Sequence, residues 1–453
     1  MFCKIFRIPN KRMPRYILAQ AWGIFISLIA AMLMALADTV ILGHFNTTDL
    51  AAVAIGSGAF IVVEFTLFGV LQAVAPLSAE LYGAGHERAA ALMLQQAVWL
   101  TFLVFIPGVL LLIYPDWFLK LSTIPTEIDE KARLYLKILA FGLPAALLYR
   151  TFYAFCSALG LVKVLLRIGL IALILHILLA SFLALKGFNE PLGLLGCAIS
   201  NVLLNYLMLV LAACWALKSQ DAQHLQIFGK WYLPNKKRWL RLLKVGLPMG
   251  MTNCIESSAF VLVSILLAPL GAEAVGAYRV LGGLASILYI IPLSIAVAVM
   301  AETAQALGAK DQTRLLSASR TGLGLSTSIA ALSAASIFLF GKFYVQLNTN
   351  NALIISIATP LLVFIAAYQL FDSIQTVIMH LLRACKITVF PMLIQIVLFW
   401  GVGLFGGWWL CYKTGLKTEG FLIALDVALV LLAIILSVLW KKISTSLLAS
   451  FPK

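Results

Sequence analysis

The residues best suited to binding chemistry lie in the apolar stretch 243–260, LKVGLPMGMTNCIESSAF, which contains a single acid, Glu256. A charged side chain at the centre of a bilayer costs about 2.5–3.5 kcal/mol, so Glu256 should face a polar interior and not lipid. Pro248, about two turns earlier, removes a backbone hydrogen bond and can bend the helix. One helical face, with spacing i, i+3, i+4 and i+7, is expected to hold Asn253, Glu256, Ser257 and Phe260. The pattern predicts a membrane helix that lines a wet cavity.

A second apolar stretch carries Asp372, which shares a helical face with Tyr368 and Gln375 by i+4 and i+3 spacing. An acid one turn from an aromatic ring suits a cation, which can pair with the carboxylate and rest on the ring. If Glu256 and Asp372 line one cavity of low dielectric constant, they titrate as a coupled pair. The expected chemistry is therefore competition between cations and protons for two carboxylates.

The first half of the chain has its own acids, Asp38 in MALADTVILGHF and Glu64 in AFIVVEFTLFG. Acids within membrane segments are functional by default, although Asp38 could instead mark a helix end at the membrane interface. His176 lies in a third apolar stretch. We interpret it first as a hydrogen-bonded interior histidine, with a proton relay as the alternative.

The sequence does not assign a role to three further charged residues in apolar stretches. Arg150 lies about five residues from the next turn, so its side chain could reach the interface or have a function. Arg279 lies towards a helix end, and Asp426 lies about two turns from the end of the last apolar stretch. We assign no function to these three from sequence.

All of these residues belong to an unusually apolar chain. Of its 453 residues, 62% are apolar and 11% are charged, which is typical of membrane proteins. A membrane-spanning helix needs about 20 apolar residues. We predict an all-α integral membrane protein with twelve spans, approximately at residues 16–42, 51–76, 92–114, 134–158, 164–185, 192–217, 243–268, 276–301, 320–340, 354–382, 388–412 and 420–440.

The longest loop, residues 218–242, is basic and divides the chain almost in half. A shift of 225 residues places Gly83 and Ala84 on Gly308 and Ala309, and it places the span 51–76 on 276–301. We therefore predict two six-helix lobes related by a parallel pseudo-two-fold repeat, as in many secondary transporters. The predicted domains are a basic cytoplasmic N-terminus (1–15), an N-lobe with helices 1–6 (16–217), a cytoplasmic linker (218–242), a C-lobe with helices 7–12 (243–440) and a cytoplasmic C-terminal tail (441–453).

The net charge of +15 would fit a nucleic-acid-binding protein, but its distribution argues for a membrane topology. Of the 33 lysines and arginines, 23 fall in stretches on one side of the predicted spans and seven on the other. By the positive-inside rule both termini are cytoplasmic. We therefore expect the chain to lie in a lipid bilayer and not to bind nucleic acid.

Motifs for enzyme chemistry are missing from the sequence. The seven cysteines form no CxxC spacing, and the five histidines are scattered. No metal-ligand or nucleophile–base motif stands out. We predict that the chain is not an enzyme and needs no cofactor.

Five stretches together resemble the multidrug and toxic compound extrusion (MATE) family, specifically its NorM-like branch. These are ADTVILG at 37–43, ELYGAG at 80–85, GLPMGMTNCIESSAF at 246–260, SILYIIPLS at 286–294 and YQLFDSIQTVIMHLLRACK at 368–386. The resemblance covers nearly the whole chain. It implies an antiporter that expels organic cations in exchange for H⁺ or Na⁺, with two lobes around a cavity that opens alternately to either side.

The resemblance also implies roles for individual residues. The residues that would bind the coupling ion are Glu256, Asp372, Tyr368 and Asp38. A possible Na⁺ site would be formed by Glu256, Tyr368 and Asp372. Tyr289 stands where related pumps line the drug cavity. As candidates for the substrate cavity we take Glu64, Tyr289, Asn253, Ser257, Phe260 and Gln375.

Departures from the family pattern lie in the N-lobe. The fifth helix usually carries two amide or acidic residues one turn apart, and here those places hold His176 and Ala180. Glu64 stands where a neutral residue is expected. The usual composition of an N-lobe Na⁺ cage is therefore missing. We hypothesise that protons can drive the pump, with Asp38 titrating alongside the C-lobe pair Glu256 and Asp372. Glu64 either titrates with them or lines the drug cavity, and His176 is a possible relay.

The leading prediction is a monomeric multidrug efflux antiporter of the bacterial cytoplasmic (inner) membrane, with cationic drugs or toxins as substrates. The alternative is a flippase for lipid-linked oligosaccharides from the same superfamily, which would need a basic cavity for pyrophosphate. The residues within the spans are mainly acidic, which favours the exporter. A channel remains open on sequence alone, as do the coupling ion, its stoichiometry and the physiological substrate.

Overall fold

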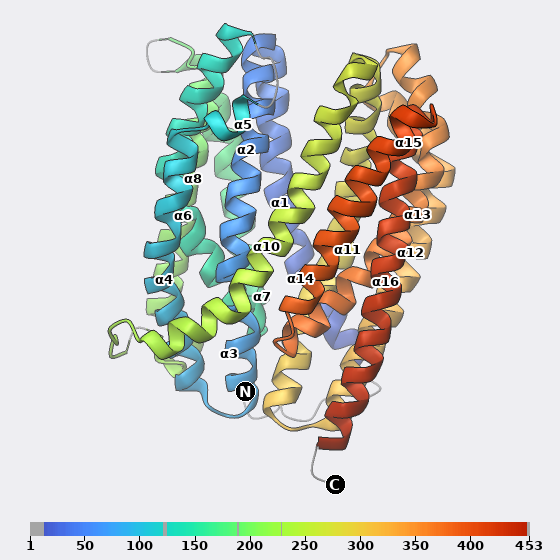
Figure 1. Ribbon diagram of the computed structural model, residues 1–453. Coiled ribbons are helices and arrows are strands. Elements are labelled where there is room, and N and C mark those ends of the chain that lie inside the picture. The colour runs from blue at the N-terminus through green and yellow to red at the C-terminus, as the bar shows by residue number, and fades with distance from the viewer. Residues whose placement is uncertain (1–12, 121–124, 188–189, 228, 451–453) are drawn as a thin grey trace. The chain divides into compact units, whose positions relative to one another are not determined.

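The computed structural model describes residues 13–450 except 121–124, 188–189 and 228, and within these residues it is all-helical (Figure 1). The first residues of the predicted cytoplasmic N-terminus and the last three of the tail lie outside this range. Twelve helical segments of the described part are long and apolar enough to cross a membrane. A helix satisfies every backbone polar group within its own segment, which lipid requires. The predicted fold class and number of spans are confirmed.

The elements follow one another with short connections. In chain order they are α1 (Met13–Phe45), α2 (Thr47–Leu71), α3 (Val74–Gly83), α4 (Glu87–Ile113), α5 (Asp116–Leu119), α6 (Thr126–Ala158), α7 (Val162–Ser181), the π-helical η3 (Phe182–Lys186), α8 (Leu194–Lys218), α9 (Gln220–His224), α10 (Lys236–Leu267), the 3₁₀-helical η4 (Ala268–Leu270), α11 (Ala272–Gly308), α12 (Gln312–Asn348), α13 (Ala352–Ala384), α14 (Val389–Gln395), the π-helical η5 (Ile396–Gly406), α15 (Gly407–Lys413) and α16 (Lys417–Ser450). Some spans combine elements, since α2 continues into α3 and α14 continues through η5 into α15.

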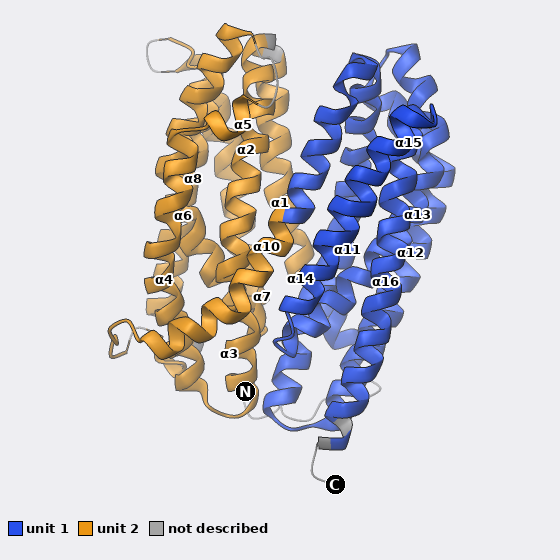
Figure 2. Ribbon diagram, in the orientation of Figure 1, with its two compact units in different colours: residues 1–22, 255–453 blue, residues 23–254 orange. Residues whose placement is uncertain are grey.

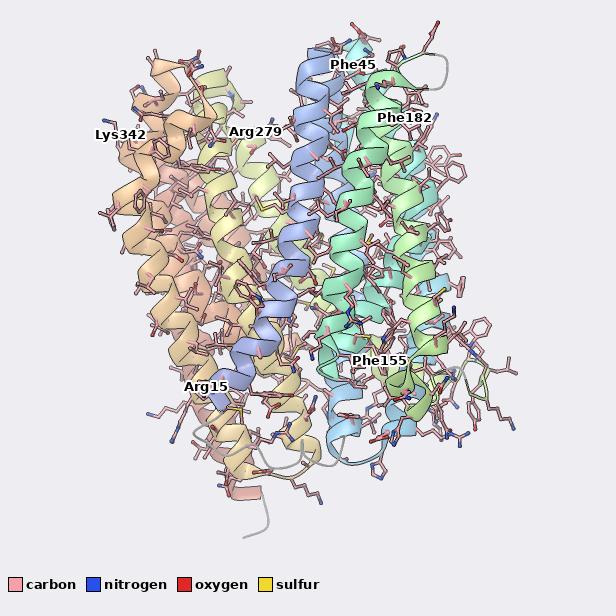
Figure 3. All side chains as sticks on the ribbon, turned by 180° about the vertical axis from the view of Figure 1, so that it is seen from behind. Arg15, Phe45, Phe155, Phe182, Arg279 and Lys342 are labelled. Carbon is pink, nitrogen blue, oxygen red and sulfur yellow. The ribbon has the colours of Figure 1, made fainter. Side chains whose placement is uncertain are left out.

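The chain forms two compact units, and two helices contribute residues to both (Figure 2). Unit 1 comprises residues 1–22 and 255–453, and unit 2 comprises residues 23–254. The helix α1 is therefore divided after Trp22 and α10 after Cys254. Figure 3 shows α1 from end to end, with Arg15 near its beginning and Phe45 at its end. The lobe boundaries at the 218–242 linker stay a prediction.

Each unit is organised around one central helix. In unit 2, α6 packs against α2, α4 and α8, and in unit 1, α13 packs against α11, α12 and α16. A core of unit 2 is built from buried apolar side chains of several helices, among them Leu42, Val53, Tyr135 and Leu194.

The first part of α10 packs on α2 through glycines. A Cβ atom at Gly250 would lie 2.7 Å from the carbonyl oxygen of Thr66, and one at Gly69 would lie 2.7 Å from the Cα atom of Gly250. Only glycine permits such a backbone approach between membrane helices. The close crossing brings Asn253 to α2, where its Nδ2 atom donates a hydrogen bond of 3.2 Å to the carbonyl oxygen of Phe65.

The predicted bend at Pro248 coincides with a local hydroxyl contact. The helix α10 continues through Pro248. Thr252 Oγ1 donates to the Pro248 carbonyl oxygen at 2.9 Å. Such back-bonding often bends a helix, and neighbouring hydroxyl groups help membrane helices to tolerate proline.

The segment that follows α9 is held against α4 by two buried glutamines. Gln95 Nε2 donates to the Ile227 carbonyl oxygen at 3.0 Å, and Gln96 Nε2 donates to that of Leu233 at 3.1 Å. Gln96 Oε1 also accepts from the backbone nitrogen of Asn235 at 2.7 Å. The described part of the predicted linker is thus anchored to α4 and does not hang free.

Candidate ion-coupling sites

Asp372 lies buried on α13, where a side chain one turn later satisfies its carboxylate. Gln375 Nε2 donates to Asp372 Oδ1 at 2.9 Å and lies 3.3 Å from Thr376 Oγ1. Tyr368, also buried, packs edge-on against Phe260 of α10, with ring centroids 6.1 Å apart and an interplanar angle of 67°. The predicted face of α13 therefore exists, and it contacts the part of α10 that belongs to unit 1.

Glu256 joins this group from α10. Its side chain lies within electrostatic range of Asp372, Arg383 and Gln395. The phenol of Tyr289, on α11, lies within electrostatic range of both carboxylates. The structure thus brings together, within unit 1, the predicted residues Glu256, Phe260, Tyr289, Tyr368, Asp372 and Gln375.

Sequence reasoning missed two members of this group, Arg383 and Gln395. Both are buried. A guanidinium is always positively charged in proteins, so Arg383 places a fixed cation near Glu256. In the sequence, Arg383 is a basic residue between two apolar runs, and the positive-inside count assigned it to a cytoplasmic stretch. Only the packing of α13 against its neighbours shows that this side chain turns inward.

In unit 2, Asp38 of α1 pairs with His176 of α7. The His176 Nε2 and Asp38 Oδ1 atoms lie 2.9 Å apart, and the histidine is fully buried. Its Nδ1 atom lies 3.3 Å from Ser200 Oγ of α8. Because a carboxylate only accepts hydrogen bonds, the ring donates from Nε2, and in a neutral ring Nδ1 then accepts from the serine hydroxyl. The thiol of Cys197 and the phenol of Tyr135 lie within electrostatic range of Asp38.

This arrangement matches our first interpretation of His176 as a hydrogen-bonded interior histidine. Its contact with Asp38 shows a partner that sequence reasoning had not assigned. The carboxylate has a nitrogen and a sulfur atom as neighbours, whereas hard cations prefer several oxygen ligands. The role of His176 as a proton relay stays a prediction.

Glu64 of α2 pairs with Arg150 of α6. Arg150 Nε donates to Glu64 Oε1 at 3.1 Å. The guanidinium carbon of Arg150 lies 5.7 Å from the ring centre of Phe65 and 5.4 Å from that of Phe68. The charge on Glu64 is therefore balanced by a fixed cation, and the choice between a coupling role and a place in the cavity wall stays a prediction.

The remaining candidates have simpler surroundings. Asn253 lies at the crossing of α10 and α2 described above, and Ser257 is half-buried on α10 in unit 1. Arg279 is exposed, on the end of unit 1 away from Arg15 (Figure 3). Asp426 is half-buried on α16. Within the described residues, no three His, Cys, Asp or Glu side chains are grouped to hold a metal ion.

Comparison with known proteins decides the family. The model of the MatE family matches residues 24–182 and 248–409, which together exceed half of the chain. The chain belongs to the MatE family. The two matched segments begin 224 residues apart, close to the 225-residue shift that the sequence shows. The first segment includes Asp38, Glu64 and His176, and the second includes Glu256 and Asp372.

Among relatives, the chain is 41% identical to a probable multidrug resistance protein NorM of Aromatoleum aromaticum, over 87% of this chain and 85% of the relative. It is 30% identical to the multidrug resistance protein NorM of Aliivibrio fischeri, over 85% and 84% of the two chains. These relationships confirm the predicted NorM-like resemblance.

Solved structures of MATE transporters share the fold. The eukaryotic MATE transporter AtDTX14 superposes with a TM-score of 0.89 at 19% identity, covering 98% of this chain and 99% of that one. The Vibrio cholerae MATE transporter VcmN in its bent form superposes with a TM-score of 0.84 at 17% identity, covering 98% and 99%. The MatE fold thus extends over nearly the whole chain.

Proposed function

We propose that this MatE protein is a multidrug efflux transporter that spans the bacterial inner membrane several times and exports amphipathic organic cations. The observation that carries the proposal is the family match over both halves of the chain, together with relatives named as multidrug resistance proteins. The acidic side chains within the spans support cationic substrates. They do not favour the lipid-linked oligosaccharide flippase, whose cavity would need basic groups for pyrophosphate.

The coupling-ion set of unit 1 consists of Glu256 and Asp372 with Tyr368 beside them. Arg383 adds one fixed positive charge. With both acids ionised, these three charged groups sum to a net charge of −1, which one bound cation neutralises. An organic cation and a coupling H⁺ or Na⁺ would therefore compete for the carboxylates of Glu256 and Asp372. Antiport requires such competition.

The membrane potential sets a condition on stoichiometry. Exchange of one H⁺ or Na⁺ for one monovalent drug moves no net charge, whereas each extra charge moved contributes about 2.3 kcal/mol per 100 mV. We propose that the second ion is a proton held by Asp38 and His176 in unit 2. Two ions per drug would then come from one set in each unit.

Orientation and assembly complete the proposal. We place both termini in the cytoplasm, because the basic residues of the connecting segments are concentrated on that side. The proposed transporter is a monomer without a cofactor, and it uses H⁺ or Na⁺ only as the coupling ion.

The test is ethidium efflux from proteoliposomes under separately imposed pH and Na⁺ gradients. Glu256→Gln and Asp372→Asn should each abolish coupled efflux while the protein still inserts and elutes as a single species. Glu419→Gln, at an exposed acid of α16, is the matched control and should behave like the wild type. Wild-type efflux from either well-folded variant would remove that carboxylate from the mechanism.

A further inference from the structure

The contact between α2 and α6 contains the parts of an organic-cation site. Glu64, Phe65 and Phe68 of α2 surround the guanidinium of Arg150, with the carboxylate at 3.1 Å and the two ring centres at 5.7 and 5.4 Å. A carboxylate with aromatic faces within about 6 Å is the arrangement that binds delocalised or quaternary cations. Arg150 is itself such a cation, because its charge is spread over a planar group that stacks on rings.

A second ion pair in the same chain shows what a closed, structural contact looks like. Arg314 of α12 makes two hydrogen bonds to Glu302 of α11 and a third, of 3.1 Å, to Gln305. The side chains of Arg314 and Glu302 are only 4% and 2% exposed. Fork-like pairing of this kind is strong and specific in geometry.

The Arg150 contact is open by comparison. Within the described residues, the Arg150 side chain makes one hydrogen bond, and the side chains of Arg150 and Glu64 are 25% and 10% exposed. Tyr149 and Tyr153 lie within electrostatic range of the guanidinium. The buried hydroxyl of Tyr153 has no hydrogen-bond partner among the described residues, so a polar group of a ligand could still bond to it.

We propose that Glu64, Phe65 and Phe68 form a binding site for a monovalent organic cation, and that Arg150 occupies this site until such a cation displaces it. The ligand class is planar or quaternary cations with delocalised charge. This inference rests on the proposed function, since the exported cations would be the natural ligands. The inference adds to the proposed function a second site, which lies in unit 2 and does not include the carboxylates of unit 1. At this site Arg150 competes with the ligand.

The competitor has a measurable consequence. When a binding-competent state is populated only in part, the apparent dissociation constant rises by the inverse of that fraction. If Arg150 leaves the site free about one tenth of the time, its removal tightens binding about tenfold. The gain depends on Glu64, because the carboxylate provides the charge that either cation must pair with.

The experiment measures binding of tetraphenylphosphonium to the purified full chain by equilibrium dialysis. A Glu256→Gln/Asp372→Asn background removes the carboxylates of unit 1. In this background Arg150→Gln should lower the dissociation constant about tenfold, and Glu64→Gln/Arg150→Gln should lose that gain. Arg279→Gln, at an exposed arginine, is the matched control and should leave it unchanged.

Two results would overturn the proposal: wild-type affinity in folded Arg150→Gln, or a gain that persists after Glu64 is also replaced. If Arg150→Gln does not fold, Arg150→Lys takes its place. A smaller gain is then expected, since an ammonium competes less well over rings than a guanidinium, and unchanged affinity contradicts the site. Because binding is read without transport, loss of efflux alone would count against the proposed function and not against this site.

Discussion

Two substitutions of His176, which pairs with Asp38, separate its effect on thermal stability from its effect on proton-coupled efflux. His176→Leu removes a buried donor that lies 2.9 Å from Asp38 Oδ1. A hydrogen bond to a charged group contributes about 1.5–3 kcal/mol. For a chain of 150–250 residues, 1 kcal/mol shifts Tm by about 2–4 °C. Unit 2 spans residues 23–254, so we expect His176→Leu to lower its Tm by about 3–12 °C.

His176→Gln separates the two roles of the ring. The glutamine amide can still donate to Asp38, but it takes up no proton in the physiological range. We therefore expect near wild-type Tm and an altered pH profile of proton-driven ethidium efflux. Thermal unfolding in detergent measures the first quantity, and proteoliposomes in sodium-free buffer measure the second. His86→Gln, at an exposed histidine, is the matched control.

Each half of this reasoning has its own refutation. An unchanged Tm in His176→Leu would show that the Asp38 contact contributes nothing to unit 2. An unchanged pH profile in His176→Gln would show that the ring holds no coupling proton. If sodium-free proteoliposomes show no efflux and added Na⁺ restores it, protons are not the coupling ion.

Two other predictions concern unit 1 and the topology. Glu302→Gln should destabilise the protein by about 3–5 kcal/mol because it leaves Arg314 buried without its charge partner, whereas Glu302→Met/Arg314→Met should recover most of that loss in thermal unfolding; equal damage in both variants would contradict this. In a variant whose native cysteines are replaced, cysteines at Thr48 and Pro125 should react with an impermeant thiol reagent in intact cells and one at Lys230 should not; labelling at Lys230 would reverse the proposed orientation.

Local patterns in the sequence predicted local geometry well. The i, i+3 and i, i+4 spacings placed Tyr368, Asp372 and Gln375 on one face of α13, and the Asp372–Gln375 hydrogen bond follows from that face. The twelve spans were predictable because lipid forces each apolar run to form a helix. These features depend only on residues within one helix.

Contacts between distant helices were not predictable in the same way. His176 and Asp38 are 138 positions apart, and Arg150 and Glu64 are 86 positions apart. Whether two side chains meet depends on how each helix is rotated and shifted against its neighbour, which periodicity within one helix does not define. For this reason Arg150 could be interpreted either as a side chain that reaches the interface or as a functional residue.

The division into units shows a similar limit. The basic linker at residues 218–242 marks the boundary between the two halves of the sequence. The compact units of the structure are instead defined by contacts between helices. The helices α1 and α10 are each single elements that contribute residues to both units. Gly246 and Gly250 of α10 lie against the backbone of α2, a contact that no pattern in the sequence predicted.

The buried acids of the chain differ in what balances their charge, and this difference orders them by their capacity to couple ions. Glu302 is buried against the Arg314 guanidinium and accepts two hydrogen bonds from it, so its charge is already balanced. Glu64 is balanced by a guanidinium that one hydrogen bond holds, so a competing organic cation can release it. Asp38 is paired with the buried His176 ring at 2.9 Å and with no fixed cation among the contacts of the described residues, which is why we propose this pair as the proton site. Glu256 lies within electrostatic range of both Arg383 and Asp372, and with both acids ionised the three groups carry a net charge of −1. We therefore propose Glu256 and Asp372 as the pair that exchanges drug for coupling ion.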